Sequence, residues 1–123
     1  MSNKFVTLQE YAQHFGLIVL SGYQSLKTRK IRFMQINRPG FELTGFFDAT
    51  NKNYIVVLGH REIIYINQAK KEDLIKAYDF LTNDECPAII LTWNQECPSD
   101  LLNIAKKKSF PILSTGMSSS NLT

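Results

Sequence analysis

Residues Tyr54-Ile55-Val56-Val57-Leu58-Gly59 are the stretch of this sequence that decides the fold. Tyr54 to Leu58 are β-branched or apolar throughout, so a strand made from them is apolar on both faces, and Gly59 ends it. Strands that are buried on both faces are typical of parallel sheets covered by helices. A second apolar run, Ala88 to Trp93, is entered through Pro87 and has the same character. These two segments predict an α/β fold.

Helical patterns alternate with these strands in the second half of the chain. A short helix is expected over 60–67, and a firmer one over 71–81 has Leu74, Ile75, Tyr78 and Leu81 on one face. Pro98 suits the first turn of a further helix, which ends in Lys106 to Lys108, and 111–113 is the last expected strand. The alternation predicts a layered, mainly parallel sheet flanked by helices, with right-handed crossovers.

The first half of the chain begins with a helix signal. Thr7 and Glu10 have the spacing of a capping box, and a helix over 7–15 is closed by Gly16. Its apolar stripe consists of Val6, Leu8, Tyr11, Ala12 and Phe15. Strands are predicted over 17–20 and 31–36, and a short helix over 41–47.

The length and composition indicate one soluble domain. The chain has 123 residues, of which 44% are hydrophobic and 20% charged. No window approaches the ~18 consecutive apolar residues of a membrane span, and the first residues lack the layout of a secretory signal. We expect a cytoplasmic protein with no membrane partner, a domain over 1–113, and a serine-rich linker over 114–123 that leads toward an absent domain.

Charge and cysteine content predict neither a nucleic-acid partner nor a metal. The net charge is +3, and the lysine runs at 70–71 and 106–108 fit solvated helix faces. Cys86 and Cys97 each precede a proline, and neither has a second ligand at metal-binding spacing. We therefore expect reduced cysteines and no zinc site.

Ordinary packing explains the segment Ile36-Asn37-Arg38-Pro39-Gly40 least well. Gly40 and Gly45 have the spacing of a phosphate-binding loop, but Phe46-Phe47 stand where such a loop needs Lys and Ser or Thr. Glu42 and Asp48 have no identifiable partner that would adapt them for acid/base catalysis, and no Ser or Cys lies in a nucleophile motif. No catalytic residue is predicted, and Pro39, Gly40, Gly45 and Asp48 are assigned to a structural turn.

A binding corner is predicted where two strands end. Ligands of open α/β sheets collect beyond the carboxyl ends of the strands, where helix N-termini present unpaired N–H groups to anions. If the ends of the strands before Arg38 and His60 are adjacent, Asn37, Arg38, His60 and Arg61 line a small basic corner suited to phosphate or an acidic side chain. Trp93-Asn94 could add a flat surface at the same edge.

An alternative to the binding corner stays open. In this alternative Asn37 caps the following turn, Arg38 pairs with Glu42 or Asp48, and His60 and Arg61 are solvated. Exposed phenylalanines could also form a protein-interaction surface, or they could pin the short helix to the sheet; they are Phe41, Phe46 and Phe47.

The motif at 36–48 resembles the signature of the N-terminal domain of bacterial HPr kinase/phosphorylase. The resemblance rests on Ile36-Asn37-Arg38-Pro39-Gly40, Glu42-Leu43 and Gly45-Phe46-Phe47-Asp48. Supporting matches are Gly16-Leu17, Val19-Leu20, Gly22, Leu58-Gly59, Glu62, Tyr65-Ile66, Cys86-Pro87-Ala88-Ile89-Ile90, Glu96, Pro98 and Pro111-Ile112-Leu113. It covers the chain from about Leu8 to Ser118.

The resemblance implies a two-domain parent enzyme that phosphorylates a serine of the phosphocarrier HPr, using ATP or pyrophosphate with Mg²⁺, and also removes that phosphate. It further implies a homohexamer assembled through the catalytic domain, a role in carbon-source regulation, and an N-terminal fold similar to the first lobe of Mur ligases. The family's phosphate loop, magnesium ligands and HPr-binding signature belong to the second domain, so no cofactor is expected in this chain.

These implications give two hypotheses. The chain is a regulatory or assembly domain that is inactive alone and has its own catalytic domain as partner, with HPr reached through the parent enzyme. Alternatively, it is an independent module that binds a phosphorylated small molecule or nucleotide at the basic corner.

Overall fold

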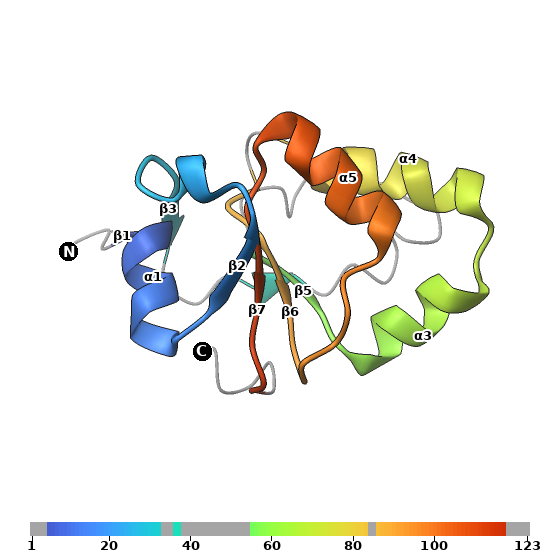
Figure 1. Ribbon diagram of the computed structural model, residues 1–123, viewed down its shortest axis with the longest axis horizontal. Helices are drawn as coiled ribbons and strands as arrows, with labels where there is room; N and C mark the ends of the chain where they lie inside the picture. The colour runs from blue at the N-terminus through green and yellow to red at the C-terminus, as the bar shows by residue number, and fades with distance from the viewer. Residues whose placement is uncertain (1–4, 33–35, 38–54, 84–85, 118–123) are drawn as a thin grey trace.

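The structure is a computed structural model that describes residues 5–32, 36–37, 55–83 and 86–117. Its central element is a five-stranded sheet with the strand order β2-β7-β6-β5-β4 (Figure 1). Its strands are β2 (Ile18–Ser21), β4 (Ile36–Asn37), β5 (Ile55–Leu58), β6 (Ile89–Leu91) and β7 (Ile112–Ser114). The pairs β4–β5, β5–β6 and β6–β7 are parallel, whereas β2 runs antiparallel to β7. The predicted α/β fold with a mainly parallel sheet is confirmed.

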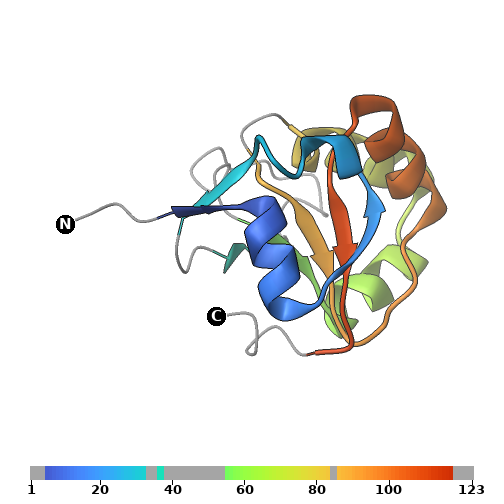
Figure 2. The ribbon, with the colours of Figure 1, turned by 60° about the vertical axis from the view of Figure 1, so that its left-hand side comes forward.

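Helices cover both faces of this sheet (Figures 1 and 2). On one side lie α3 (His60–Gln68), α4 (Lys71–Leu81) and α5 (Ser99–Lys108), and on the other lies α1 (Leu8–Phe15). Each face has its own hydrophobic cluster, one beneath α3, α4 and α5 and one beneath α1. The sheet is therefore the middle of three layers.

Strand β5 shows why its sequence determines this arrangement. Val56 and Leu58 point into the cluster beneath α3, α4 and α5, while Ile55 and Val57 point into the cluster beneath α1. All four side chains are at most 2% exposed. Successive side chains of a strand point to opposite faces, so an unbroken apolar run requires a layer on each side.

The sequence predictions for three helices are confirmed to within a residue. α3, α4 and α1 occupy the expected segments, and Thr7 and Glu10 form the predicted capping box, in which the Glu10 N–H donates to Thr7 Oγ1 at 3.2 Å. α5 begins at Ser99, directly after Pro98. None of the helices in the described ranges is both long and apolar enough to span a bilayer.

The prediction of one strand over 31–36 was wrong. Lys30–Arg32 forms β3, which pairs antiparallel with β1 (Phe5–Thr7) in a separate two-stranded sheet, whereas β4 belongs to the main sheet. Val6 was expected in the helical stripe but lies opposite Ile31 in β1. The pairing holds this segment extended up to the N-cap Thr7, whose φ of −72° and ψ of 156° are extended as well.

Differences also occur at other ends of elements. β6 ends at Leu91 and not at Trp93, and Ser114, expected in the linker, is the last residue of β7. A short 3-10 helix, η1 (Tyr23–Ser25), follows β2. The helix predicted over 41–47 lies outside the described residues, as do Pro39, Gly40, Gly45, Asp48 and the three phenylalanines at 41, 46 and 47.

Candidate functional site

The carboxyl ends of the parallel strands are joined by backbone hydrogen bonds. The Thr92 N–H, just after β6, donates to the Leu58 carbonyl at 3.2 Å, and the Thr115 N–H, just after β7, donates to the Leu91 carbonyl at 2.9 Å. β4 lies beside β5, with Asn37 level with Val56. This edge is where α/β sheets place their ligands, and the predicted corner falls on it.

The strands that precede Arg38 and His60 are neighbours, but Asn37 is level with Val56, two residues before the end of β5. His60 and Arg61 are the first two residues of α3, and both are exposed. Arg38 lies outside the described residues, and Asn37 is placed through its backbone in β4. The convergence of the four side chains stays a prediction.

The sequence analysis did not assign Glu62 a role at this corner. Its carboxylate accepts a hydrogen bond from the Gly59 N–H at 2.7 Å, and the residue is only 9% exposed. A carboxylate in the first turn of a helix is stabilised by the unpaired N–H groups there. An anion bound at the start of α3 would therefore compete with Glu62 for these donors, which makes the corner less basic than its sequence indicates.

A local pattern could have identified Glu62. A Glu three residues after the residue that precedes a helix is the second half of a capping box. We recognised that pattern at Thr7 and Glu10 because Thr is a common N-cap. Gly59 has no side chain to complete a box, but its N–H is still available to Glu62.

The turn after β6 holds an exposed tryptophan. Trp93 and Asn94 have positive φ angles of 58° and 55°, and the Gln95 N–H donates to the Thr92 carbonyl at 3.2 Å, as in a type I′ turn. The N–H groups of Trp93 and Asn94 also donate to the carbonyls of Met117 and Thr115. The side chain of Trp93 is 60% exposed, so the turn presents an aromatic surface at the carboxyl edge and not a core residue.

The thiols are unsuited to nucleophilic chemistry. Burial raises the pKa of Cys86 to about 12 and that of Cys97 to about 11. Since the thiolate is the reactive form, both side chains are protonated and inert at neutral pH. Within the described segments, no three His, Cys, Asp or Glu side chains come together as metal ligands would.

Comparison with known proteins gives one family. The family model described as "HPr Serine kinase N terminus" matches residues 6–123. An HPr kinase/phosphorylase of Lactobacillus johnsonii is 34% identical over 108 residues, which are 88% of this chain and 34% of the relative. HPr kinase/phosphorylases of Bacillus subtilis and Pediococcus pentosaceus are 27% and 30% identical over 118 residues, or 38% of each relative.

The chain thus spans little more than a third of the curated relatives that it matches. The match includes the motif at 36–48 and the strands and helices described above, and it agrees with the resemblance inferred from the sequence. This chain belongs to the family of HPr serine kinase N-terminal domains.

Proposed function

We propose that this chain acts as a non-catalytic regulatory or assembly domain of a bifunctional HPr serine kinase/phosphorylase. The observation that carries the proposal is the match of residues 6–123 to the N-terminal family, together with relatives that are about two and a half times as long. The only glycine pair with phosphate-loop spacing, Gly40 and Gly45, is followed by Phe46-Phe47 and not by Lys and Ser or Thr.

In this proposal the chemistry belongs to a catalytic domain that is a partner of this chain. That domain would use ATP or pyrophosphate with Mg²⁺ to phosphorylate a serine of HPr, and it would carry the contacts of a cytoplasmic homohexamer. The contribution of the present domain would be to assembly or to a response to the carbon source, and so to the control of sugar transport.

A domain exchange in the Bacillus subtilis relative tests the regulatory role. Three proteins are compared: the intact relative, the relative without its matched region, and a chimera in which this chain replaces that region. We expect all three to phosphorylate HPr, and we expect the chimera to recover the assembly state or the metabolite response that the deletion loses. A chimera that behaves like the deletion in both assays would contradict the proposal.

A second candidate function is binding of a phosphorylated small molecule at the corner of Asn37, Arg38, His60 and Arg61. The adjacency of β4 and β5 and the exposure of His60 and Arg61 favour it. Calorimetric titration with glucose 6-phosphate and with ATP tests it. We expect saturable heat that Arg38→Ala and Arg61→Ala abolish, while Lys107→Ala, which removes an equal charge from the exposed end of α5, leaves it unchanged.

Glu62 gives this second candidate a sharper test. Because its carboxylate occupies the Gly59 N–H, Glu62→Gln should remove the repulsion of a bound anion and tighten binding, while keeping an acceptor for that N–H. Absence of saturable heat in all variants, or binding that Glu62→Gln weakens, would remove the corner as an anion site.

A further inference from the structure

The strand β2 lies at one edge of the main sheet. In the strand order β2 is the terminal strand, with β7 as its one neighbour among the described strands. An edge strand presents a row of backbone N–H and C=O groups on its outer side, which can pair with another strand. Figure 2 shows β2 along the near border of the sheet, beside β7.

Exposed apolar side chains lie at both ends of this strand. Tyr23, just beyond its carboxyl end, is 72% exposed, and Ile18, its first residue, is 63% exposed. Within the described parts of the chain these are the two most exposed large hydrophobic residues. Val19 and Leu20, between them, are only partly buried and pack on the two hydrophobic clusters. The edge therefore combines open backbone groups with apolar contact area.

The usual devices that protect a sheet edge are largely missing here. Natural edge strands are shielded by charged residues, especially Lys, by Pro or by β-bulges. The segment from Gly16 to Gln24 contains no charged residue and no proline. β2 does have a register shift against β7 between Val19 and Ser21, which shortens the regular stretch but leaves no charge on it.

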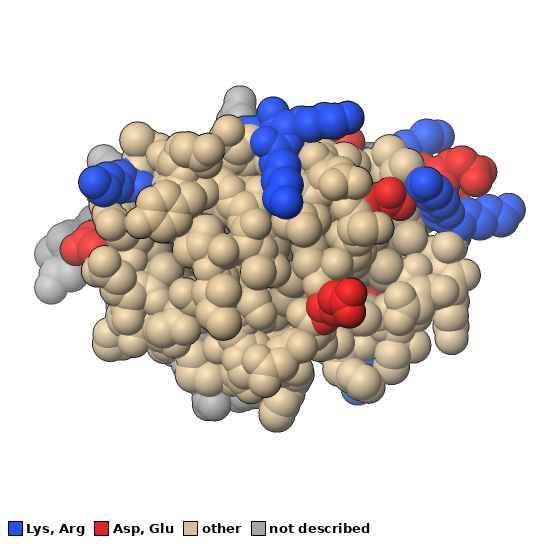
Figure 3. All heavy atoms as spheres, in the orientation of Figure 1, with Lys and Arg blue, Asp and Glu red and all other residues tan. Residues whose placement is uncertain are grey.

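The surface around β2 is uncharged as well. In the face of Figure 3, which has the orientation of Figure 1, the area over β2 and the sheet is formed by residues without charge. Lysine and arginine side chains gather mainly around α5 and α4, and the group at the C-terminal end of α5 reaches from the top of the face toward its middle. Two copies of this face can therefore approach one another while their like charges stay apart.

We propose that β2 pairs antiparallel with β2 of a second copy of this chain about a two-fold axis, which joins the two sheets into one. We take a second copy of this chain as the partner of the edge strand. Antiparallel pairing of a strand with its own copy is isologous, so symmetry supplies each backbone donor with an acceptor. The uncharged segment also places no like charges opposite one another in that pairing. The contact is short, since β2 has four residues, so the dimer forms in a concentration-dependent way.

Sedimentation of the chain over a wide concentration range tests the dimer. We expect a monomer–dimer equilibrium that Ile18→Lys weakens by at least about tenfold, because a lysine on an edge strand opposes pairing. Ile64→Lys is the matched control: Ile64, on α3, is 46% exposed and far from β2 in sequence, so this change adds the same charge and should leave the dissociation constant unchanged. A monomer at every concentration would overturn the proposal, and so would a dimer that Ile18→Lys leaves intact.

Hydrogen exchange of the unmodified chain gives a second measurement that needs no variant. Amides of residues 18–21 that face away from β7 should exchange more slowly as the protein concentration rises, because pairing buries them. Protection that grows on α3 or α4 while β2 stays unchanged would place the contact elsewhere and overturn the assignment.

Discussion

At the residue scale, Gly22 illustrates how one position joins distant parts of the chain. Gly22 follows β2 with a φ of +73°, and a Cβ at this position would overlap the backbone of Phe110 and Pro111. The loop that begins at Gly22 also contacts Phe110 through a side chain, because the guanidinium of Arg29 lies 5.0 Å from the centre of the Phe110 ring. Close approach of two backbones, and not only turn geometry, requires a glycine here.

Two glycine substitutions separate these causes. Gly22→Ala should lower the free energy of unfolding by about 2–4 kcal/mol, through both backbone strain and overlap with Phe110 and Pro111. Gly16→Ala is the control: Gly16 has a φ of +64° but open space around its Cβ position, so a loss of about 1 kcal/mol is expected. Urea unfolding measures both, and equal losses would contradict the close approach at Gly22.

The capping box predicts a pH effect on stability. The hydrogen bonds from Thr7, first from its backbone N–H and then from its side chain, lower the pKa of Glu10 below its usual value of 4.5. A lowered folded-state pKa means that the ionised Glu10 stabilises the fold above pH 4.5, and that this contribution is lost as the pH falls through the folded-state pKa. Glu10→Gln should thus be less stable than the parent at pH 7, and the difference should be smaller at pH 3. Urea unfolding at both pH values checks this, and a constant difference would contradict it.

Thiol reactivity tests the burial of the cysteines. Raising the pKa of Cys97 from an ordinary 9.0 to about 11 lowers its thiolate fraction at pH 8 roughly a hundredfold. Cys86, which is 1% exposed and has a pKa of about 12, should react more slowly still. We expect two slow phases with an aromatic disulfide reagent, of which Cys97→Ser removes the faster one. Rapid modification of either thiol in the folded chain would contradict this placement.

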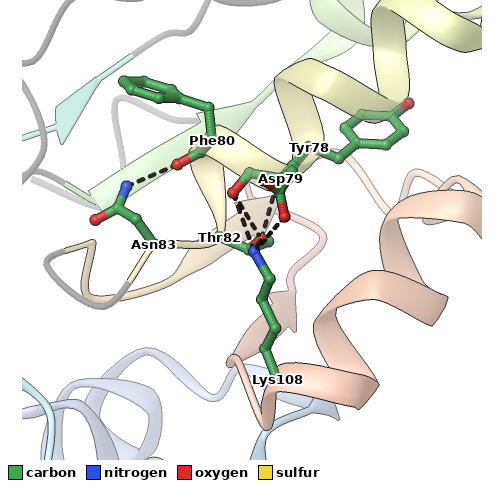
Figure 4. Close-up of polar contacts among 6 residues, drawn as sticks. All are labelled: Tyr78, Asp79, Phe80, Thr82, Asn83 and Lys108. Carbon is green, nitrogen blue, oxygen red and sulfur yellow. Dashed lines mark hydrogen bonds and ion pairs between the residues drawn. The ribbon is translucent and has the colours of Figure 1, made fainter.

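At the element scale, the C-terminal end of α4 is capped by side chains that lie outside the helix (Figure 4). Thr82 Oγ1 donates to the Tyr78 carbonyl at 2.8 Å, and Asn83 Nδ2 donates to the Phe80 carbonyl at 2.8 Å. Lys108 Nζ, from the end of α5, donates to the Asp79 carbonyl at 3.1 Å and to the Asp79 carboxylate at 2.8 Å. The Tyr78 carbonyl also accepts from the Thr82 backbone N–H at 3.0 Å, whereas the carbonyls of Asp79 and Phe80, in the last turn, accept from the side chains of Lys108 and Asn83.

Lys108 therefore holds the ends of α4 and α5 together. Lys108→Met keeps the aliphatic stem but removes the donors, and it should lower the free energy of unfolding by about 1 kcal/mol, because the Asp79 carboxylate is well exposed and adds little. Lys107→Met is the control, since Lys107 is exposed at the neighbouring position and should change stability by less than about 0.5 kcal/mol. Thermal unfolding compares the two, and equal effects would contradict a specific role of Lys108.

Local patterns predicted most helices, whereas contacts between distant residues decided the strands. The segments of α3 and α4 follow from apolar periodicity, and Gly59 marks the start of α3. The separation of β3 from β4 could not be predicted, because it depends on the pairing of β3 with β1, about 25 residues earlier in the chain. The contact of Lys108 with Asp79 is likewise invisible in the sequence, since 29 residues separate the two.

The sheet edge of the candidate site could be predicted from the sequence, whereas the convergence of its four side chains stays a prediction. The carboxyl edge followed from the sheet type, and the pairing of β4 with β5 agrees with it. The burial of Glu62 beside Gly59 changes the electrostatics of that corner, and it follows from a local pattern that we did not apply to a glycine. Trp93 was expected to end a strand, but it lies in a turn whose positive φ angles depend on the segment at 115–117.

At the scale of the whole molecule, the described residues form a three-layer domain, and no cluster of metal ligands occurs among them. Its described cysteines are protonated, its strand ends are tied by backbone hydrogen bonds, and its exposed features are an open edge strand and one aromatic turn. They fit a family whose matched relatives are about two and a half times as long and are named for kinase and phosphorylase activity.

Transfer of phosphate to HPr by this chain alone tests the central claim most directly. The chain is incubated with HPr, Mg²⁺ and either ATP or pyrophosphate, beside the Bacillus subtilis relative as a positive control, and phosphoserine in HPr is measured by mass spectrometry. We predict phosphorylation by the relative and none above the enzyme-free level by this chain. Serine phosphorylation of HPr by the 123-residue chain would contradict its assignment as a non-catalytic domain.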